Sequence, residues 1–463
     1  MKNALLEGLG GPVGRYARRS GLWFNPIPWS LLVATVTFFI LAVRQIPCVQ
    51  TSETQAVNAF IRLCYSDIPL SWTSEGLAQG ALPFGGHQMN HPPLLGFVML
   101  CVVMLARVAG APVAADLGVQ AQLDGARVFF GIAAVFLFAS FLVWVLCFSR
   151  LGRDADQGRR ATWDGMWVAA SPVVLATGLI SWDLLAIAFS AFGLLCLARG
   201  RLAEAGIVLG LAAGVGTMAI AVALAAALTI GLRGTLRHLA AFGLGAGLTF
   251  ITVNLPLVIY DWDAVAAFYY GEITKDAGYG SVFFLPEAFG FQIRAAGSLG
   301  FLLTLLVLAL ITSWLYLRGL RPRVGTVVAL FVFPTALFAA AYPPQTALWL
   351  LFAVLLARPW QRVRLPFVIT QVAYWAAVWA YLAGHLNPSY NGHLNLYFLA
   401  LVLRVAVEVG IVVSCLRDAA HPSRDRLRSP DVPDPIGGVL NDTERSLPLP
   451  VSPALAPLAP QPG

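Results

Sequence analysis

The chain has 463 residues, of which 58% are hydrophobic and only 11% are charged. An ordinary soluble domain is about 25% charged, so this composition excludes a soluble globule and indicates a protein that uses lipid as part of its solvent. The net charge is +7, and the basic residues lie in short clusters between apolar blocks. That pattern is typical of membrane topology and excludes a nucleic-acid-binding protein, which gathers its basic residues in one patch.

The first apolar block, residues 23–43, follows Arg15, Arg18 and Arg19. A membrane span needs about 20 apolar residues, and this block is long enough. It is too long for the hydrophobic region of a signal peptide, and no small-residue cleavage site follows it. We therefore expect residues 1–22 to form a cytoplasmic N-terminus and the block to be a retained membrane helix.

Basic clusters divide the rest of the chain into segments. They lie at residues 150–160, 199–201, 233–237, 318–323, 358–364 and from 417 onward. If every cluster is cytoplasmic, the apolar segments between consecutive clusters must cross the bilayer in pairs. Together with residues 23–43 and 126–149, this predicts an all-α integral membrane protein with about twelve crossings over residues 23–416 and both ends in the cytoplasm.

One apolar block does not fit the pairing. Residues 94–112 follow Pro92-Pro93 and contain Arg107. A full crossing here would place the cluster at residues 150–160 outside, so we expect the block to lie in the outer membrane interface. A third full crossing before that cluster is the alternative.

The topology leaves two outer loops large enough to hold a site, at about residues 48–125 and 261–294. Cys48 and Cys64 flank one stretch of the first loop, where an extracytoplasmic location would allow a disulfide between them. The other four cysteines lie in apolar blocks and are expected to be small buried hydrophobes. The segment 417–463 is rich in Pro, Asp and Arg and is predicted to be a disordered cytoplasmic tail.

Asp67 is the first candidate for chemistry. It follows Tyr65 and Ser66 in the first outer loop, and a carboxylate beside aromatic residues at the mouth of a helix bundle can act as a general base toward a hydroxyl. A helix cap or a solvated loop aspartate is the alternative interpretation. His87 and His91 are four residues apart, but no third ligand has a metal-site spacing, so neither a metal nor another cofactor is expected.

Two further positions carry ionisable groups at the outer ends of predicted crossings. Asp183, which follows Ser181-Trp182, is either a functional carboxylate or a helix N-cap. In the second outer loop, Lys275 is the only lysine expected outside and could hold a phosphate, while Tyr279 could stack on a sugar ring. An interfacial aromatic belt with ordinary surface charge is the alternative for this loop.

Several short motifs occur in the same order as in a known family. The run Cys64-Tyr65-Ser66-Asp67-Ile68-Pro69 resembles the first outer loop of the family 87 glycosyltransferases. These are GT-C superfamily enzymes of the mycobacterial type that use polyprenyl-phosphate mannose. Ser181-Trp182-Asp183-Leu184 is similar to that family's Asn-Trp-Asp-Leu, and Tyr342-Pro343-Pro344-Gln345 is similar to its Tyr-Ser-Pro-Gln. Residues 434–440 resemble a common tail, so the resemblance spans nearly the whole chain.

The resemblance implies a GT-C-like bundle with interfacial helices in the outer loops. The donor would be a sugar, often mannose, on a polyprenyl phosphate, and the acceptor a glycolipid or lipoglycan on the outer face of the plasma membrane. The family's first-loop aspartate acts as base, and the matching position here is Asp67. One carboxylate suffices because the departing phosphate needs no general acid, unlike the leaving group in glycoside hydrolysis. Asp183 and Gln345 lie in other matching motifs and are carried over as substrate-binding candidates.

The chain also departs from the family pattern. Four motifs lack or replace a charged residue that the family often carries: Glu75-Gly76-Leu77, Asn90-His91-Pro92, Gly216-Thr217-Met218 and Ala340-Ala341. The last two take the place of segments that often hold lysines. Since charged groups make the strongest phosphate contacts, a donor phosphate would here need Lys275, Arg62 or His91 instead.

These observations lead to three hypotheses. The first is a membrane glycosyltransferase, with mannose as the first donor sugar to consider and arabinofuranose as the second. The second is a catalytically inactive relative that binds lipid-linked glycans or scaffolds envelope enzymes, which the missing lysines favour. The third, a transporter, is disfavoured because the intramembrane charges are few and lie at predicted outer ends.

Overall fold

The computed structural model describes residues 25–82, 84, 90–151, 162–358, 361–386, 396–425 and 434–441. Within these residues the secondary structure is helical throughout, with no strands and one isolated bridge between Ser52 and Gln55. The prediction of an all-α chain is therefore confirmed for the described part of the protein.

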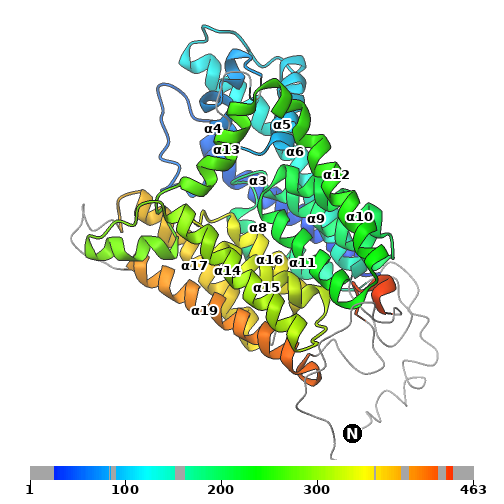
Figure 1. Ribbon diagram of the computed structural model, residues 1–463. Helices are drawn as coiled ribbons and strands as arrows, with labels where there is room; N and C mark the ends of the chain where they lie inside the picture. Colours follow the sequence, from blue (N-terminus) through cyan, green and yellow to red (C-terminus); the bar gives the residue numbers. More distant parts are fainter. Residues whose placement is uncertain are drawn as a thin grey trace, which may run out of the picture.

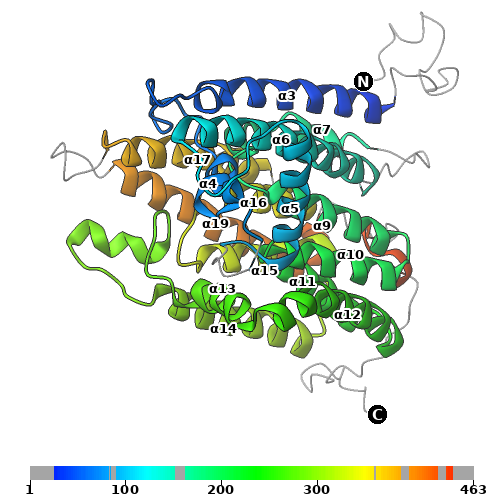
Figure 2. The ribbon, with the colours of Figure 1, turned by 90° about the horizontal axis from the view of Figure 1, so that it is seen from above.

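Six helices in this part of the chain are long and apolar enough to cross a membrane. They are α3 (Pro26–Val49), α6 (Val119–Leu151), α12 (Leu236–Tyr260), α14 (Ala296–Leu317), α17 (Gln361–Leu382) and α19 (Leu396–Ala420). At 1.5 Å per residue, a helix of about 22 residues spans about 33 Å, which matches a hydrocarbon core of about 30 Å. The long helices run in a common direction (Figure 2), as expected of a multi-pass membrane protein.

Among the described residues, the remaining apolar helices are shorter, at 12 to 16 residues. They are α5 (Pro93–Val108), α9 (Asp183–Ala198), α10 (Leu202–Val215), α11 (Met218–Arg233), α15 (Val324–Leu337) and α16 (Thr346–Ala357). Helices α15 and α16 are buried along almost their whole length, whereas the long helices expose apolar side chains such as Phe39, Leu244 and Leu302. Helices α15 and α16 thus lie in the protein core, and the long helices present a surface suited to lipid.

Short elements complete the fold. They are α4 (Asp67–Ser74), α7 (Asp164–Ala169), α8 (Pro172–Thr177), α13 (Trp262–Thr274) and the 3-10 turns η2 (Leu77–Gln79), η3 (Val282–Phe289), η4 (Pro422–Arg424) and η5 (Gly438–Asn441). Helices α4, α5 and α13 gather at one end of the bundle (Figure 1), so the two expected outer loops meet there. Helix α5, which covers most of the exceptional block 94–112, runs across the direction of α3 and α6 (Figure 2).

Helices α10 and α12 approach each other closely. A Cβ added at Gly206 would lie 2.1 Å from the Phe242 carbonyl oxygen, and one added at Gly245 would lie 2.5 Å from that of Ala203. Real Cβ atoms do not come so near, so this approach requires glycine at both positions. Such small-residue contacts are typical of helix packing in membranes, where they allow close backbone contact.

Two parts of the segment 417–463 are ordered, contrary to the expectation of a disordered tail. Helix α19 continues to Ala420, and residues 434–441 pack back onto the bundle. The Asp434 carboxylate accepts hydrogen bonds from the Arg233 guanidinium at 2.7 Å and from the Val324 N–H at 2.9 Å. The expectation failed here because distant partners, and not local composition, order the segment. Residues 426–433 and 442–463 lie outside the described residues.

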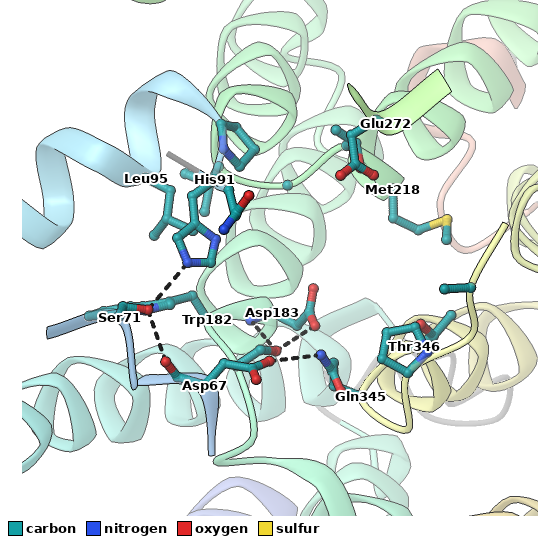
Figure 3. Close-up of a pocket in the computed structure, with 18 of the residues that line it drawn as sticks. Asp67, Ser71, His91, Leu95, Trp182, Asp183, Met218, Glu272, Gln345 and Thr346 are labelled. Carbon is teal, nitrogen blue, oxygen red and sulfur yellow. Dashed lines mark hydrogen bonds between the residues drawn. The ribbon is translucent and has the colours of Figure 1, made fainter. Parts of the chain in front are cut away.

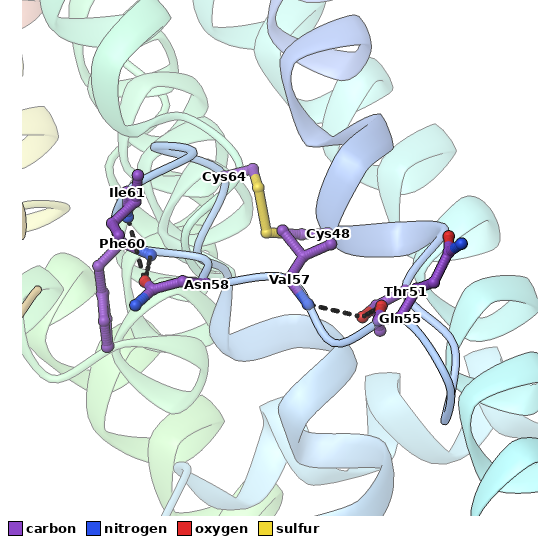
Figure 4. The surroundings of a disulfide bond; sticks show 8 residues. All are labelled: Cys48, Thr51, Gln55, Val57, Asn58, Phe60, Ile61 and Cys64. Carbon is purple, nitrogen blue, oxygen red and sulfur yellow. Dashed lines mark hydrogen bonds between the residues drawn. A yellow bond between two sulfur atoms is a disulfide. The ribbon is translucent and has the colours of Figure 1, made fainter.

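A disulfide between Cys48, in the last turn of α3, and Cys64 closes the start of the first outer loop (Figure 4). The pairing that the sequence allows is therefore present in the structure. Inside the closed loop, the Asn58 side chain accepts hydrogen bonds from the backbone N–H groups of Phe60 and Ile61 at 3.1 and 3.2 Å. Cys64 is buried three residues before Asp67, so the bond anchors the segment that carries this carboxylate.

Removing the disulfide is expected to lower the free energy of unfolding by about 3 kcal/mol, because the bond closes a loop of about 16 residues in the unfolded chain. The variant is Cys48→Ser/Cys64→Ser, and thermal unfolding in detergent measures the effect. Cys101→Ser, at an exposed free cysteine, is the matched control. Equal melting temperatures for the paired variant and the control would contradict a stabilising role of the bond.

Candidate functional site

A cavity of about 530 Å³, whose lining residues are drawn in Figure 3, lies at the end of the bundle where α4, α5 and α13 gather. Its walls come from both outer loops, from the α10–α11 turn and from the segment 339–346. Five residues selected from the sequence line it, namely Asp67, His91, Asp183, Lys275 and Gln345. The fold therefore brings together residues that lie more than 200 positions apart, such as Asp67 and Gln345 with a separation of 278.

Two residues selected from the sequence are not among those that line the cavity. The Tyr279 ring makes edge contacts with Phe284 and Tyr381, with centroid distances of 5.3 and 5.7 Å. Arg62 is exposed on the loop that the disulfide closes. The structure therefore does not bring these two residues to the wall that Asp67 lines, because Tyr279 packs in an aromatic cluster and Arg62 lies on the disulfide-closed loop.

Asp67 is the first residue of α4. The helix is capped by Ser66, whose Oγ accepts a hydrogen bond from the Ile68 N–H at 3.3 Å. The Asp67 N–H donates to the Ile180 carbonyl at 2.7 Å, which ties the first outer loop to the segment before Asp183. Since Ser66 performs the capping, the Asp67 side chain is left to line the cavity.

The Asp67 carboxylate accepts hydrogen bonds from the Gln345 amide at 3.2 Å and from the Tyr65 hydroxyl. The side chains of Asp67, Asp183 and Gln345 point toward one another (Figure 3). Burial raises the pKa of Asp67, and the nearby Asp183 charge raises it further, whereas the two hydrogen bonds oppose the rise. A carboxylate whose pKa moves toward neutrality is a stronger base for taking a proton from a hydroxyl.

Asp183 is the first residue of α9, and Trp182 is the N-cap, so the simple N-cap interpretation is wrong by one residue. One Asp183 oxygen accepts a hydrogen bond from the Trp349 indole N–H at 2.8 Å, and the other accepts one from the Ser181 hydroxyl at 2.6 Å. Both oxygens are therefore engaged by protein donors. Asp183 fixes α16 against α9 and places negative charge beside Asp67.

Glu75 was not selected from the sequence, although it lines the cavity. One of its oxygens lies 3.2 Å from His91 Nε2, and its side chain is 3% exposed. Burial raises the pKa of Glu75 to about 7, with a further rise from the Asp67 charge, and burial lowers the pKa of His91 to about 4. Below about pH 7 Glu75 is therefore protonated, whereas His91 is neutral above about pH 4. The spacing of Asp67, Ser71 and Glu75, four residues apart on one helical face, is the signal that would have identified it.

Glu75→Gln is expected to be more stable than the wild type above pH 7. The pKa of Glu75 rises from 4.5 to about 7 on folding, so the folded state binds more protons between these values and the wild type loses stability as pH rises through this window. The advantage of the variant should reach about 3 kcal/mol above the window and vanish below it. Melting temperatures of both proteins from pH 4 to 8 measure the difference.

The stability of Glu75→Gln must be compared with that of the wild type because the lowered pKa of His91 changes stability with pH in the direction opposite to that of Glu75. A histidine held neutral by burial loses stability as pH falls below its ordinary pKa of 6.5, which flattens the wild-type profile. Glu53→Gln, at an exposed glutamate of the same loop, is the control and should follow the wild type. A constant difference between Glu75→Gln and the wild type at all pH values would contradict the assignment.

Positive charge at the cavity comes first from Lys275. Among the described lining residues it is the only lysine or arginine, and it forms an ion pair with Glu272 one turn earlier. Because the two side chains carry opposite charges and lie in contact, their charges partly cancel at the cavity wall. Both side chains are partly exposed. His91 carries no charge near neutral pH because burial lowers its pKa.

Helix N-termini provide further positive potential. Helices α9, α11 and α16 begin at Asp183, Met218 and Thr346, all of which line the cavity (Figure 3). None of the three N-cap residues caps its helix with a side-chain hydrogen bond. A helix N-terminus carries about half a positive charge, so three such ends converging on one cavity favour an anionic group there.

No group of three or more His, Cys, Asp or Glu side chains able to hold a metal ion occurs among the described residues. His87, which was weighed with His91 as a metal ligand, lies outside the described residues.

The fold and the cavity together define a helical, multi-pass membrane protein with a carboxylate-lined cavity at one end of its bundle. A scan against protein-family models gives no match, and a search of the curated proteins gives none either.

Proposed function

We propose that the protein is a membrane glycosyltransferase that moves a sugar from a polyprenyl-phosphate donor to a glycolipid or lipoglycan acceptor. The observation that carries the proposal is Asp67, a partly buried carboxylate with a raised pKa that lines a cavity of about 530 Å³. The family resemblance of the surrounding motifs adds to this, since its expected base falls on the same residue.

The chemistry follows from this position. Asp67 takes the proton of an acceptor hydroxyl while the hydroxyl oxygen forms a bond to the anomeric carbon of the sugar. The bond from that carbon to the phosphate oxygen breaks, and polyprenyl phosphate leaves with the electron pair. No acid is required because the phosphate departs as an anion.

The leaving phosphate needs stabilisation, and the lysines of the family pattern are missing from two cavity segments. Thr217 and Ala341 line the cavity in those segments. The N-terminal ends of α9, α11 and α16 offer a substitute, because oriented backbone N–H groups stabilise developing negative charge. Lys275 adds to the stabilisation of the phosphate if it leaves its ion pair with Glu272 and contacts the phosphate instead.

We also propose a GT-C-like bundle of about twelve crossings with the cavity on the outer face of the plasma membrane and both chain ends in the cytoplasm. Helices α9 and α11 start at the cavity and end beside Arg199 and Arg233, which supports this orientation. Each has 16 residues, a length of about 24 Å. Because this is less than the core thickness of about 30 Å, the cavity would be recessed within the outer leaflet.

The test is a transfer assay. Membranes containing the wild type are incubated with radiolabelled polyprenyl-phosphate mannose and a lipid extract, then with the corresponding arabinofuranosyl donor. Label that enters glycolipid with the wild type, and not with Asp67→Asn, is the expected result. A folded wild type that transfers neither sugar would contradict the proposal.

A non-catalytic glycan-binding protein is the second candidate, favoured by the charge of the cavity. Among the described lining residues, four carry carboxyl groups (Asp67, Glu75, Asp183 and Glu272) and one is a lysine, which is paired. Carboxylates accept hydrogen bonds from sugar hydroxyls and repel phosphate. Binding of a neutral glycolipid to the wild type and to Asp67→Asn, without transfer by either, would favour this candidate.

A further inference from the structure

An ion pair is buried in the interior of the bundle, away from the cavity, which corrects the expectation that the intramembrane charges lie at the outer ends of the crossings. Arg404 and Glu408 lie one turn apart on α19, and Glu408 is at the midpoint of that helix, which runs from Leu396 to Ala420. Both side chains are 1% exposed, with 3.3 Å between Arg404 Nη1 and Glu408 Oε1. An ionisable pair inside a membrane-spanning helix is costly and usually serves a function.

The pair contacts two segments that lie near the cavity. Glu408 accepts a hydrogen bond from the Gln371 amide at 2.9 Å, and the Gln371 carbonyl accepts one from the Tyr342 hydroxyl at 2.9 Å. The Arg404 guanidinium lies 3.5 Å from the centroid of the Tyr342 ring and donates to the Gly280 carbonyl. The ion pair thus connects the second outer loop with the segment 339–346.

Tyr342 is held from several directions. Its N–H donates to the Tyr279 carbonyl at 2.9 Å, and its own carbonyl accepts from the Tyr374 hydroxyl at 2.8 Å. Gly280 packs against the same group, since a Cβ at this residue would lie 1.9 Å from the Tyr374 hydroxyl and its φ is +78°. Glycine is the residue that adopts this φ without strain and fits this space. The close packing around Gly280 therefore restricts the position of Tyr342.

A short rigid link leads from Tyr342 to the cavity. Pro343 and Pro344 follow, and their rings fix φ near −65°. The next residue is Gln345, whose amide donates to the Asp67 carboxylate at 3.2 Å. A displacement of Tyr342 would therefore move the group that orients Asp67.

We propose that Arg404 and Glu408 are positioning residues that hold Gln345 against Asp67 from inside the membrane, through Tyr342. Neither belongs to the cavity wall, so neither contacts a ligand bound there. Their importance for catalysis rests on the function proposed above, whereas the protonation of Asp67 can be measured in a protein that transfers no sugar. A negative transfer assay would therefore contradict the proposed function only, whereas an unchanged protonation of Asp67 in the ion-pair variants would contradict this proposal only.

The readout is the pH at which Asp67 loses its proton. Dicyclohexylcarbodiimide modifies protonated carboxyl groups in apolar surroundings, and peptide mass spectrometry reports the labelled fraction of Asp67 at each pH. The other groups that act on Asp67 are Tyr65 and Asp183, and Glu75 senses its charge. Because the Gln345 hydrogen bond stabilises the charged form, Gln345→Leu should raise the labelling midpoint by about one pH unit.

Two variants test the ion pair without leaving a buried charge unpaired. Arg404→Lys keeps the charge but lacks the planar fork that contacts Tyr342 and Gly280 together. Arg404→Met/Glu408→Leu removes both charges, which avoids an isolated ion. Each is expected to raise the Asp67 midpoint as Gln345→Leu does.

Combining Arg404→Lys with Gln345→Leu should produce no additional shift, because both changes remove the same interaction. Arg417→Lys, at an exposed position in the last turn of the same helix, should keep the wild-type midpoint. Labelling is measured on protein that elutes as one folded species. A wild-type midpoint in both ion-pair variants, or shifts that add fully to that of Gln345→Leu, would overturn the proposal.

Discussion

Replacing Asp67 with asparagine is expected to lower the rate of sugar transfer by about 10²–10⁴-fold, the usual contribution of a positioned general base. Asparagine has nearly the same shape but takes no proton from the acceptor. The fold should be preserved, because burial already disfavours the charged form of Asp67 and a neutral amide removes that penalty. Initial rates of label transfer, measured at equal amounts of folded protein, report the effect.

The pH dependence of transfer makes the same prediction more specific. Asp67 acts as a base only when it is deprotonated, so the wild-type rate should rise with pH through a pKa above the ordinary 3.8 of an aspartate. The residual rate of Asp67→Asn should lack this rise. Asp116→Asn, at an exposed aspartate in the same outer loop, is the matched control and should behave as the wild type. A rate near that of the wild type for Asp67→Asn would remove Asp67 from the mechanism.

Glu408→Leu is expected to destabilise the protein by about 3–5 kcal/mol, the second large effect. The substitution leaves Arg404 as a buried cation with no carboxylate, and an uncompensated charge in the interior is far more costly than the loss of a contact. Gln371 also loses the acceptor for its amide. Unfolding in mixed micelles by increasing denaturant, compared with the wild type, measures the change in free energy.

The matched control is Arg404→Met/Glu408→Leu, which removes the same carboxylate without leaving a charge behind. Its stability should return close to that of the wild type, because replacing a buried ion pair by apolar residues is often neutral or stabilising. Equal losses for the single and the paired variant would show that packing, and not charge, dominates at this position.

The all-helical membrane architecture could be predicted from composition and from the lengths of the apolar blocks. Length and hydropathy are properties of the local chain, and an apolar helix of sufficient length is directly stabilised by the hydrocarbon core of the bilayer. The crossings were harder to count. Segments that the sequence assigns to full crossings, such as those of α15 and α16, form helices of 14 and 12 residues that are enclosed by protein. Their burial comes from neighbouring helices, which local hydropathy does not distinguish from burial in lipid.

The candidate site was predicted in part. Asp67, Asp183 and Gln345 were selected from motifs, and the fold places them around one cavity. Glu75 was missed because its partner, His91, is 16 positions away and their contact depends on how the loop folds. Tyr279 was selected for its residue type, but its ring packs into an aromatic cluster outside the cavity wall.

Runs of neighbouring residues are enough to show that the protein resides in a membrane, which segments are helical and which loops hold its polar groups. Helix packing, in contrast, places three helix N-termini at the cavity that Asp67 lines, and it connects Arg404 and Glu408 with Gln345 through Tyr342. The physical reason is that hydrogen bonds and buried charges act over a few ångströms. Such distances between residues far apart in the chain are set only when the helices pack.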